Sequence, residues 1–464
     1  MSKKISFMEA ALIIITMLGI IGISVIHFGL SPTTPIIFVL GLLIIWGKCR
    51  RFTWHEIHEG IQEGVTTGII PMLIFLLIGA LIASWIAAGI IPAMMVVGFK
   101  LVSVSIFVPS TFLVCAIIGT SIGSAFTTAS TVGLALMGMG LSLGFNPALI
   151  AGAVISGSVF GDKMSPLSDT TNLAAAVAGT DLFKHIRNMM WTTIPAFVIS
   201  LILFYLLGSQ ASIQSSQNEI SHLTNILEKH FTMGWWSTIP ILAMIGCSLT
   251  RVPAIATLLL NIALSLGLFI AQSPNVTLSA IAEIIENGFI SKTGVSNIDS
   301  LLSRGGLSSM LGAISLIILT LSLGGLLMKF GLIHRLMAPL SNKLTTATGL
   351  VTATVIGGAL ANIMIGEQYL SIILPGKALK PSFDKSDLDE VVLSRALEDS
   401  GTVLNTLIPW GVSGVFMANT LGVSTIAYLP FCFFSLLCPI LSILSGMTGV
   451  GIKKKTPNRI INQK

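Results

Sequence analysis

The stretch Gly161-Asp-Lys-Met-Ser-Pro-Leu-Ser-Asp-Thr-Thr-Asn172 places three ionisable side chains and a run of hydroxyl and amide groups between two long apolar segments. A charge at the centre of a membrane-spanning helix costs about 2.5–3.5 kcal/mol on insertion scales, so such a cluster needs a function or a set of partners. Asp162, Lys163 and Asp169 are therefore the first candidates for functional residues.

The composition around this stretch is that of a membrane protein. Hydrophobic residues make up 53% of the 464 residues and charged residues only 9%. Apolar runs of about 20 residues, each long enough to cross the hydrocarbon layer, recur along the chain, so we expect an all-α polytopic fold with about 11 spans. The net charge of +6 comes from short basic clusters at span ends, which orient a protein in the lipid bilayer. The composition therefore predicts no nucleic-acid partner.

Four apolar segments are too short or too interrupted to be simple spans. Glycine, proline and polar residues interrupt these segments. Backbone N–H and C=O groups that lose their helical hydrogen bonds inside the membrane must bond to protein, ions or water instead. We expect broken helices or re-entrant hairpins at residues 130–143, 161–178, 369–374 and 399–417. Basic clusters at 48–51, 184–187 and 453–455 indicate cytoplasmic loops, which predicts that both termini are cytoplasmic.

The second half of the chain resembles the first. Ile118-Gly119 recurs as Ile356-Gly357, at an offset of 238 (356 − 118). Asp162, Ser165 and Leu167 recur as Asp399, Thr402 and Leu404, at an offset of 237 (399 − 162). Gly89–Met95 resembles Gly331–Met337, at an offset of 242 (331 − 89). Basic residues favour the cytoplasmic side of a membrane, so they also give the orientation of each copy. The segment after the first copy's opening span carries only Lys100, whereas the matching segment carries Lys329, His334, Arg335 and Lys343.

This difference in charge predicts two copies of opposite topology around a site at the membrane midplane, as in many secondary transporters. The expected organisation is N-terminal spans (1–65), a first repeat (66–208), connecting spans and external loops (209–305), a second inverted repeat (306–447) and a basic cytoplasmic tail (448–464).

The first break is a candidate sodium site. Hard cations prefer oxygen ligands, and we expect Asp162 and Asp169 to be the metal-binding carboxylates. Lys163 is a supporting residue, either in a structural ion pair or extended to the cytoplasmic face. The alternative role for Ser168 or Asp169 is to cap the N-terminus of the following helix. The other candidate ligands in this break are Ser165, Ser168, Thr170, Thr171 and Asn172.

The second break, at 397–409, has the same parts. Its candidate ligands are Asp399, Ser400, Thr402, Asn405 and Thr406, with Glu398 in a supporting role. The alternative is an ordinary helix end at the membrane surface, in which Arg395 pairs with Glu398 or Asp399.

One span earlier, Asn362 and Glu367 are supporting candidates. Glu367 directly follows an apolar span, so it is either an interfacial carboxylate or a proton carrier.

At these residues the chain resembles the NhaC-type sodium/proton antiporter family, over nearly its whole length. The matching segments are Gly161–Ala174, Ala178–Asp181, Gly366–Ser371, Leu397–Thr402 and Ile408-Pro-Trp410. The resemblance implies an exchanger in the cytoplasmic membrane of a prokaryote, with inverted repeats and paired hairpins. It also implies a homodimer that works by an elevator-like motion. The same family includes sodium-coupled exchangers of malate and lactate.

Two functions are consistent with these residues. The first is secondary active exchange of Na⁺ for H⁺ by alternating access, in which both ions compete for Asp162 and Asp169 and Asp399 completes the site. The second is Na⁺- or H⁺-coupled exchange of small carboxylates, held at the helix N-termini after Pro166 and Gly401. A dedicated buried arginine is missing from both breaks, which favours ions alone.

Other classes of function fit the sequence poorly. Inverted repeats with broken helices suit alternating access better than a channel, and no nucleophile–base pair or metal-ligand spacing indicates an enzyme. We expect no cofactor, because Na⁺ and H⁺ are transported species.

Overall fold

The computed structural model describes residues 5–101, 104–209, 217–341 and 344–455. Lys343, used above to orient the second copy, and residues 456–464 of the basic tail lie outside these described residues. The described chain is helical, and a single isolated bridge between Leu388 and Lys454 is its only β-type pairing. Among the residues that the structure describes, eight helices are long and apolar enough to cross a membrane, or up to 11 if each bent pair counts as one span. This confirms the all-α polytopic fold.

The helices before the first repeat are α1 (Phe7–Gly22), its π-helical extension η1 (Ile23–His27), α2 (Thr33–Cys49) and α3 (Trp54–Thr66). The first repeat comprises α4 (Ile69–Ala87), α5 (Ile90–Leu101), η2 (Val104–Ile106), α6 (Phe107–Ile122), α7 (Ala125–Thr128), η3 (Ala129–Gly133), α8 (Leu134–Ser142), α9 (Pro147–Met164), α10 (Asp169–Ala178) and α11 (Leu182–Ser209). The connecting helices are α12 (Gln217–His230), η4 (Trp235–Ser237), α13 (Thr238–Leu249), α14 (Ala254–Gln272), α15 (Leu278–Asn287) and α16 (Ser296–Leu302).

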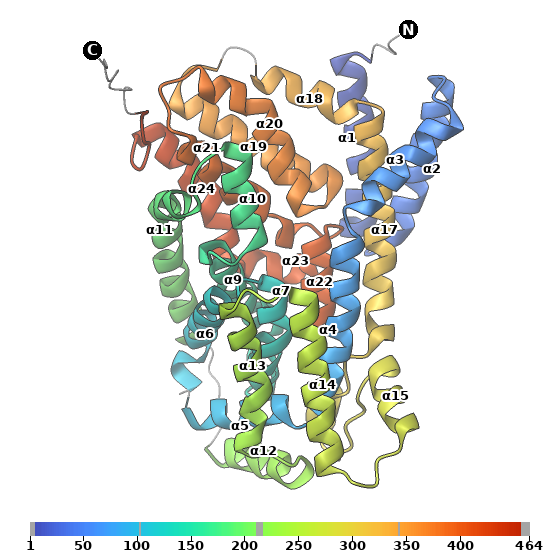
Figure 1. Ribbon diagram of the computed structural model, residues 1–464, viewed down its shortest axis with the longest axis vertical. Helices are drawn as coiled ribbons and strands as arrows, with labels where there is room; N and C mark the ends of the chain where they lie inside the picture. Colours follow the sequence, from blue (N-terminus) through green and yellow to red (C-terminus); the bar gives the residue numbers. More distant parts are fainter. Residues whose placement is uncertain (1–4, 102–103, 210–216, 342–343, 456–464) are drawn as a thin grey trace, which may run out of the picture.

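The second repeat comprises α17 (Leu307–Lys329), α18 (Leu332–Ser341), α19 (Ala347–Ile365), α20 (Gln368–Asp384), α21 (Glu390–Leu397), η5 (Glu398–Thr402), η6 (Asn405–Leu407), α22 (Val412–Leu421), α23 (Thr425–Tyr428), η7 (Leu429–Phe431) and α24 (Phe433–Thr448). Figure 1 shows that the two repeats are inverted: the short helix α5 lies at one end of the molecule and its counterpart α18 lies at the other end. The start of α1 and the end of α24 lie at the α18 end.

The helix boundaries give the register of the repeat. Helices α9 and α21 begin 243 residues apart (390 − 147), and α10 and α22 also begin 243 residues apart (412 − 169). These offsets exceed those of the first two sequence matches, 238 and 237, by five or six residues, whereas α5 and α18 begin 242 residues apart (332 − 90), as the third match predicted. Asp162 is matched by Asn405, 243 residues later, and not by Asp399. Short motifs such as Asp-x-x-Ser recur by chance, whereas helix starts and turns must recur if the folds are equivalent.

Each repeat contains one re-entrant hairpin. A left-handed glycine ends the first arm, Gly123 (φ 73°) after α6 and Gly366 (φ 71°) after α19, because this conformation suits a residue without Cβ. A side chain at Gly140, near the end of α8, would meet the ring of Phe107 at the start of α6, so the second arm returns along the first. In the second repeat, Leu350 near the start of α19 and Phe383 near the end of α20 belong to one buried cluster.

Each hairpin is followed by a broken helix, α9–α10 in the first repeat and α21–α22 in the second. The second of these bends by 45° at its break. Pro166 and Pro409 lie in the two breaks, where a proline interrupts the helical hydrogen bonding. Two of the four interrupted segments expected from the sequence, 161–178 and 399–417, contain these breaks. The other two expectations are wrong in detail: 130–143 lies almost entirely in the continuous helical stretch Ala125–Ser142, and 369–374 lies inside α20. The junction of α9 with α10 lies near the middle of the molecule in Figure 1.

The first hairpin packs on the first broken helix through glycines. Gly119 of α6 and Gly161 of α9 face each other, and a Cβ added at Gly161 would overlap the backbone of Gly119 and Thr120. Small residues allow this approach of two helices in a membrane, where packing replaces the hydrophobic effect.

We expect Gly161→Val to destabilise the protein by about 1–3 kcal/mol, because the added methyl groups force α6 and α9 apart. Gly267→Val in α14 is the matched control, since nothing lies within 4 Å of a Cβ added there. The measurement is the thermal unfolding midpoint in detergent. Equal midpoints for the two variants would contradict the close packing of these helices.

Candidate functional site

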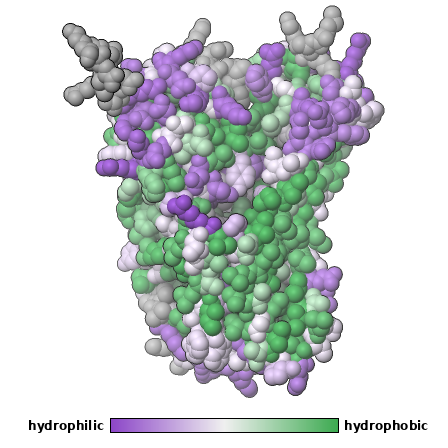
Figure 2. All heavy atoms as spheres, viewed as in Figure 1, coloured by the Kyte–Doolittle hydropathy of each residue, from purple (hydrophilic) through white to green (hydrophobic). Residues whose placement is uncertain are grey.

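A pocket of about 550 Å³ lies where the hairpin tips meet the two broken helices. Its polar lining comes from both repeats and from the turn between α13 and α14. Figure 2 shows a hydrophilic patch half-way up this face, between hydrophobic surfaces. The lining side chains with polar groups include Ser124, Thr127, Asp162, Asp169, Asn172, Ser248, Arg251, Thr257, Gln368, Tyr369, Thr402, Thr406 and Ser413.

The hydroxyl and amide groups of the first break bond mostly to its own backbone. Thr171 Oγ1 donates to the carbonyl of Lys163 (3.1 Å), and Asn172 Nδ2 donates to the carbonyls of Pro166 (3.0 Å) and Ser168 (2.6 Å). Ser168 is the N-cap of α10 and accepts from the Thr171 N–H (3.4 Å), while Ser165 Oγ accepts from the Leu167 N–H (3.2 Å). These groups replace the helical bonds that the break removes.

The second break is held in the same way by two asparagines. Asn362 Nδ2 donates to the carbonyls of Ser400 and Gly401, each at 2.9 Å. Asn405 Nδ2 donates to Asn362 Oδ1 (2.8 Å), and Asn405 Oδ1 accepts from the Ser413 N–H (2.9 Å). The hydroxyls of Ser400 and Thr406 donate to backbone carbonyls of their own segment, at 2.8 and 3.1 Å.

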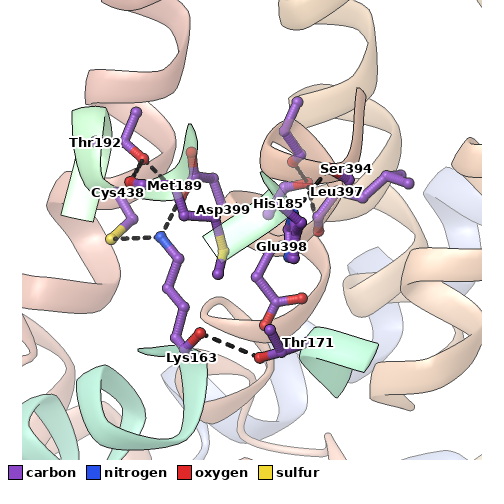
Figure 3. Close-up of polar contacts among 12 residues, drawn as sticks. Lys163, Thr171, His185, Met189, Thr192, Ser394, Leu397, Glu398, Asp399 and Cys438 are labelled. Carbon is purple, nitrogen blue, oxygen red and sulfur yellow. Dashed lines mark hydrogen bonds and ion pairs between the residues drawn. The ribbon is translucent and has the colours of Figure 1, made fainter. Parts of the chain in front are cut away.

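A buried ion pair joins the two broken helices (Figure 3). Lys163 of α9 pairs with Asp399 of η5, and both side chains are fully buried. Thr192 Oγ1 of α11 donates to the same Asp399 oxygen (3.2 Å), and Lys163 Nζ lies 3.7 Å from Cys438 Sγ of α24. Of the two alternatives for Lys163, the structure therefore has the structural ion pair. Asp399 points to Lys163 and is not part of the pocket lining.

The second break is not an ordinary helix end at the membrane surface, so that alternative is wrong. Glu398 and Asp399 are fully buried, and Arg395 donates to Ser445 Oγ (2.7 Å) and to the Gly451 carbonyl (3.1 Å) instead of pairing with them. Glu398 Oε1 accepts from Thr170 Oγ1 (3.4 Å), and Thr170 Oγ1 also lies 3.0 Å from Ser168 Oγ.

Glu367 is buried at the tip of the second hairpin, so the interfacial alternative does not hold for it. Its carboxylate is the N-cap of α20 and accepts from the Leu370 N–H at 2.7 Å.

Asp169 lies at the pocket with one oxygen bonded to each repeat. Its Oδ1 accepts from the Thr170 N–H (2.9 Å), and its Oδ2 accepts from the hydroxyl of Tyr369 at the second hairpin tip. Asp169 is exposed, in contrast to Asp162 one turn below the break.

Two residues that line the pocket each have a buried side-chain oxygen without a hydrogen-bond partner among the described residues. These oxygens are Oδ1 of Asp162, a residue that is 7% exposed, and Oγ1 of Thr402, which is 2% exposed. A carboxylate and a hydroxyl are hard oxygen donors of the kind that alkali and alkaline-earth cations prefer. Within the described ranges, no group of three or more histidine, cysteine, aspartate or glutamate residues could hold a metal ion, so Asp162, Asp169 and Asp399 do not form one cluster.

Several residues of this region were not among the sequence candidates, and four of them make the contacts discussed here. Tyr369 and Gln368 line the pocket from the second hairpin tip, Arg251 lines it from the α13–α14 turn, and Thr192 bonds to Asp399. An isolated arginine between two apolar runs was a usable signal for Arg251. Thr192 lies in an ordinary apolar span and has no such signal.

The family model for the Na⁺/H⁺ antiporter family matches residues 157–450, a range that holds both breaks and the second hairpin. The chain belongs to the Na⁺/H⁺ antiporter family. The antiporter is 40% identical to the Na⁺/H⁺ antiporter NhaC of Alkalihalophilus pseudofirmus over 98% of each chain. These matches confirm the family resemblance seen in the sequence.

Relatives with other transported species are almost as similar. The antiporter is 35% identical to the arginine/ornithine antiporter ArcD of Halobacterium salinarum, over 98% of this chain and 94% of that one. It is 36% identical to the malate-2H⁺/Na⁺-lactate antiporter of Bacillus subtilis, over 78% of this chain and 77% of that one. All three relatives are named as antiporters.

The buried ion pair should be costly to break from one side only. Asp399→Asn is expected to destabilise the fold by about 3–5 kcal/mol, because it leaves the Lys163 charge buried without a counter-charge. The double variant Lys163→Met/Asp399→Asn should recover most of this loss. Thermal unfolding of both variants in detergent is the measurement.

Lys100→Met is the matched control, since its pair with Glu228 (3.1 Å) is exposed and an exposed pair contributes at most about 1 kcal/mol. If Asp399→Asn were as stable as Lys100→Met, the ion pair would not hold the two breaks together.

Proposed function

We propose that this antiporter exchanges Na⁺ for H⁺ across the cytoplasmic membrane by alternating access. The identity of 40% over nearly the whole length of an Na⁺/H⁺ antiporter supports this exchange. The observation that carries it is the Asp162 carboxylate, buried at a pocket between two inverted repeats with an oxygen that bonds to no described residue.

The proposed ion site is built around Asp162 and Thr402. Asp162 belongs to the first repeat and Thr402 to the second, so one ion bound between them contacts both repeats. Most other candidate hydroxyls and amides bond to the broken backbone and are less available as ligands. Asp169, at the exposed side of the pocket, supplies a second negative charge that attracts cations to the site.

Competition for one carboxylate couples the two fluxes. Na⁺ binds only the deprotonated Asp162, and a proton on Asp162 removes the charge that holds Na⁺. If the protein changes its access only when the carboxylate is neutralised by one of the two ions, each passage of Na⁺ requires a return passage of H⁺. Lys163 and Asp399 have a positioning role in this scheme, because their ion pair keeps the two breaks in register.

The orientation and assembly belong to the same proposal. The end that holds α18, the α2–α3 turn and the end of α24 carries basic residues, among them Arg50 and Lys453, and we place it in the cytoplasm together with both termini. We also propose a homodimer in the bilayer, as the family resemblance implies. The exchange uses no cofactor, since Na⁺ and H⁺ are the cargo.

The second candidate function is exchange of a small organic solute coupled to Na⁺ or H⁺. The malate/lactate and arginine/ornithine relatives support it, together with a pocket far larger than one ion. Uptake of radiolabelled malate or lactate by proteoliposomes would favour this candidate over exchange of ions alone.

Asp162→Asn should abolish the Na⁺-driven proton movement of everted membrane vesicles, because the amide binds neither ion as a carboxylate does. Thr402→Val should raise the half-saturating Na⁺ concentration several-fold, because it removes one neutral ligand and leaves the carboxylate. Fluorescence of a pH-sensitive dye after addition of NaCl measures both effects.

Asp384→Asn is the control, because Asp384 is exposed and far from the pocket lining. Equal amounts of protein in the membranes must be verified for all three variants. Normal exchange by Asp162→Asn would exclude this carboxylate as the coupling site.

A further inference from the structure

Arg251 lies in a turn between two apolar helices, at the pocket described above. The helices are α13 and α14, and α13 has only 12 residues, or about 18 Å of helix at 1.5 Å per residue. Figure 1 shows both helices ending near the middle of the molecule, beside α7. Ser248 Oγ donates to the carbonyls of Ser121 (2.9 Å) and Ile122 (2.8 Å), which anchors the turn to the tip of the first hairpin.

The backbone at Arg251 is in the left-handed region, with φ at 59°. A residue with a Cβ adopts this conformation at some cost, and glycine or asparagine would be the ordinary choice for it. The preference of this turn for glycine or asparagine therefore does not explain the arginine found there.

The guanidinium lacks a counter-charge in the part of the chain that the structure describes. Arg251 is exposed to the pocket, and none of the ion pairs among described residues includes it. A charged side chain among membrane-spanning helices is costly unless it has a partner or a function. A bound anion would supply that partner.

The size of the pocket fits a solute larger than an ion. One water molecule takes about 30 Å³, so a pocket of about 550 Å³ far exceeds the needs of Na⁺ with a few waters. Pockets of about 300–1,000 Å³ are the usual size for organic ligands. Apolar side chains such as Ile74, Phe126, Met244 and Leu258 line it beside the polar groups.

We propose that the pocket binds a small neutral amino acid in its zwitterionic form, with its carboxylate on Arg251 and its ammonium group on Asp169. One cation and two carboxylates line the pocket, so a dicarboxylate would meet more repulsion than attraction. A zwitterion matches both signs of charge, and Asp162 remains free for Na⁺. This inference rests on the proposed function, because it takes the pocket at Asp162 as the transport site.

Three probes of similar size test the two charges separately. L-alanine carries both groups, L-lactate replaces the ammonium group by a hydroxyl, and ethylamine lacks the carboxylate. Binding to the full-length protein in lipid nanodiscs is measured by calorimetry in NaCl. We expect alanine to bind at least about tenfold more tightly than either of the other two, since each of them loses one charged contact. Equal or tighter binding of lactate, or binding of none of the three, would overturn the proposal.

Arg251→Gln should weaken alanine binding about 10- to 100-fold, the range expected when a hydrogen bond to a charged group is lost. Glutamine keeps the Cβ and so the same strain at this turn. Arg51→Gln is the matched control, because Arg51 has the same left-handed backbone (φ 63°) in the exposed α2–α3 turn and does not line the pocket. Arg251→Lys, which keeps the charge, should retain more affinity than Arg251→Gln.

Size-exclusion profiles establish that each variant is folded, and the lysine variant keeps the test decisive if the glutamine variant is not. Wild-type affinity in a folded Arg251→Gln protein would contradict the role of Arg251. The same wild-type preparation, in proteoliposomes, is assayed for Na⁺/H⁺ exchange. Exchange without alanine binding refutes this inference alone, whereas alanine binding without exchange refutes the proposed function alone.

Discussion

Backbone groups at the middle of a membrane have no bulk water to bond to, and the two broken helices expose several of them at that depth. Side chains satisfy these groups: Asn172 and Thr171 in the first break, and Asn405 of the second break together with Asn362 of the neighbouring hairpin helix α19. The polar residues that make the sequence unusual are thus first of all the residues that allow a helix to be broken there.

The same requirement sorts the polar residues by role. Oxygens that bond to the backbone are occupied, and the buried oxygens left at the pocket belong to Asp162 and Thr402. Asp399 is also buried with one free oxygen, but its other oxygen pairs with Lys163 and it lies away from the pocket lining. Residues that look alike in the sequence therefore separate into two groups once the helices are packed: residues that line the pocket, and the buried ion pair of Lys163 with Asp399.

The sequence predicted much of the fold because membrane insertion leaves a strong hydrophobic signal. The spans and the family were predicted from apolar runs and one long motif. Glycine and proline positions predicted two of the four interrupted segments, 161–178 and 399–417, where the structure has its breaks. Two of the three short matches gave a register that was wrong by five or six residues, because short polar matches do not align helix starts. Arg251 was missed as well, since its place at the pocket depends on α13 being short and on the contact of Ser248 with the first hairpin.

By itself, the sequence determined that this protein spans the membrane, that its two halves are related and that a few charged residues lie in segments where charges are costly. These properties follow from composition and local pattern, which need no knowledge of contacts. Only the tertiary structure decided that Lys163 pairs with Asp399 across 236 residues and that Asp162 and Thr402 line one pocket. The packing of the two inverted repeats pairs the Asp399 carboxylate with Lys163 and leaves an oxygen of Asp162 without a partner among the described residues. A local sequence pattern contains no information about this packing.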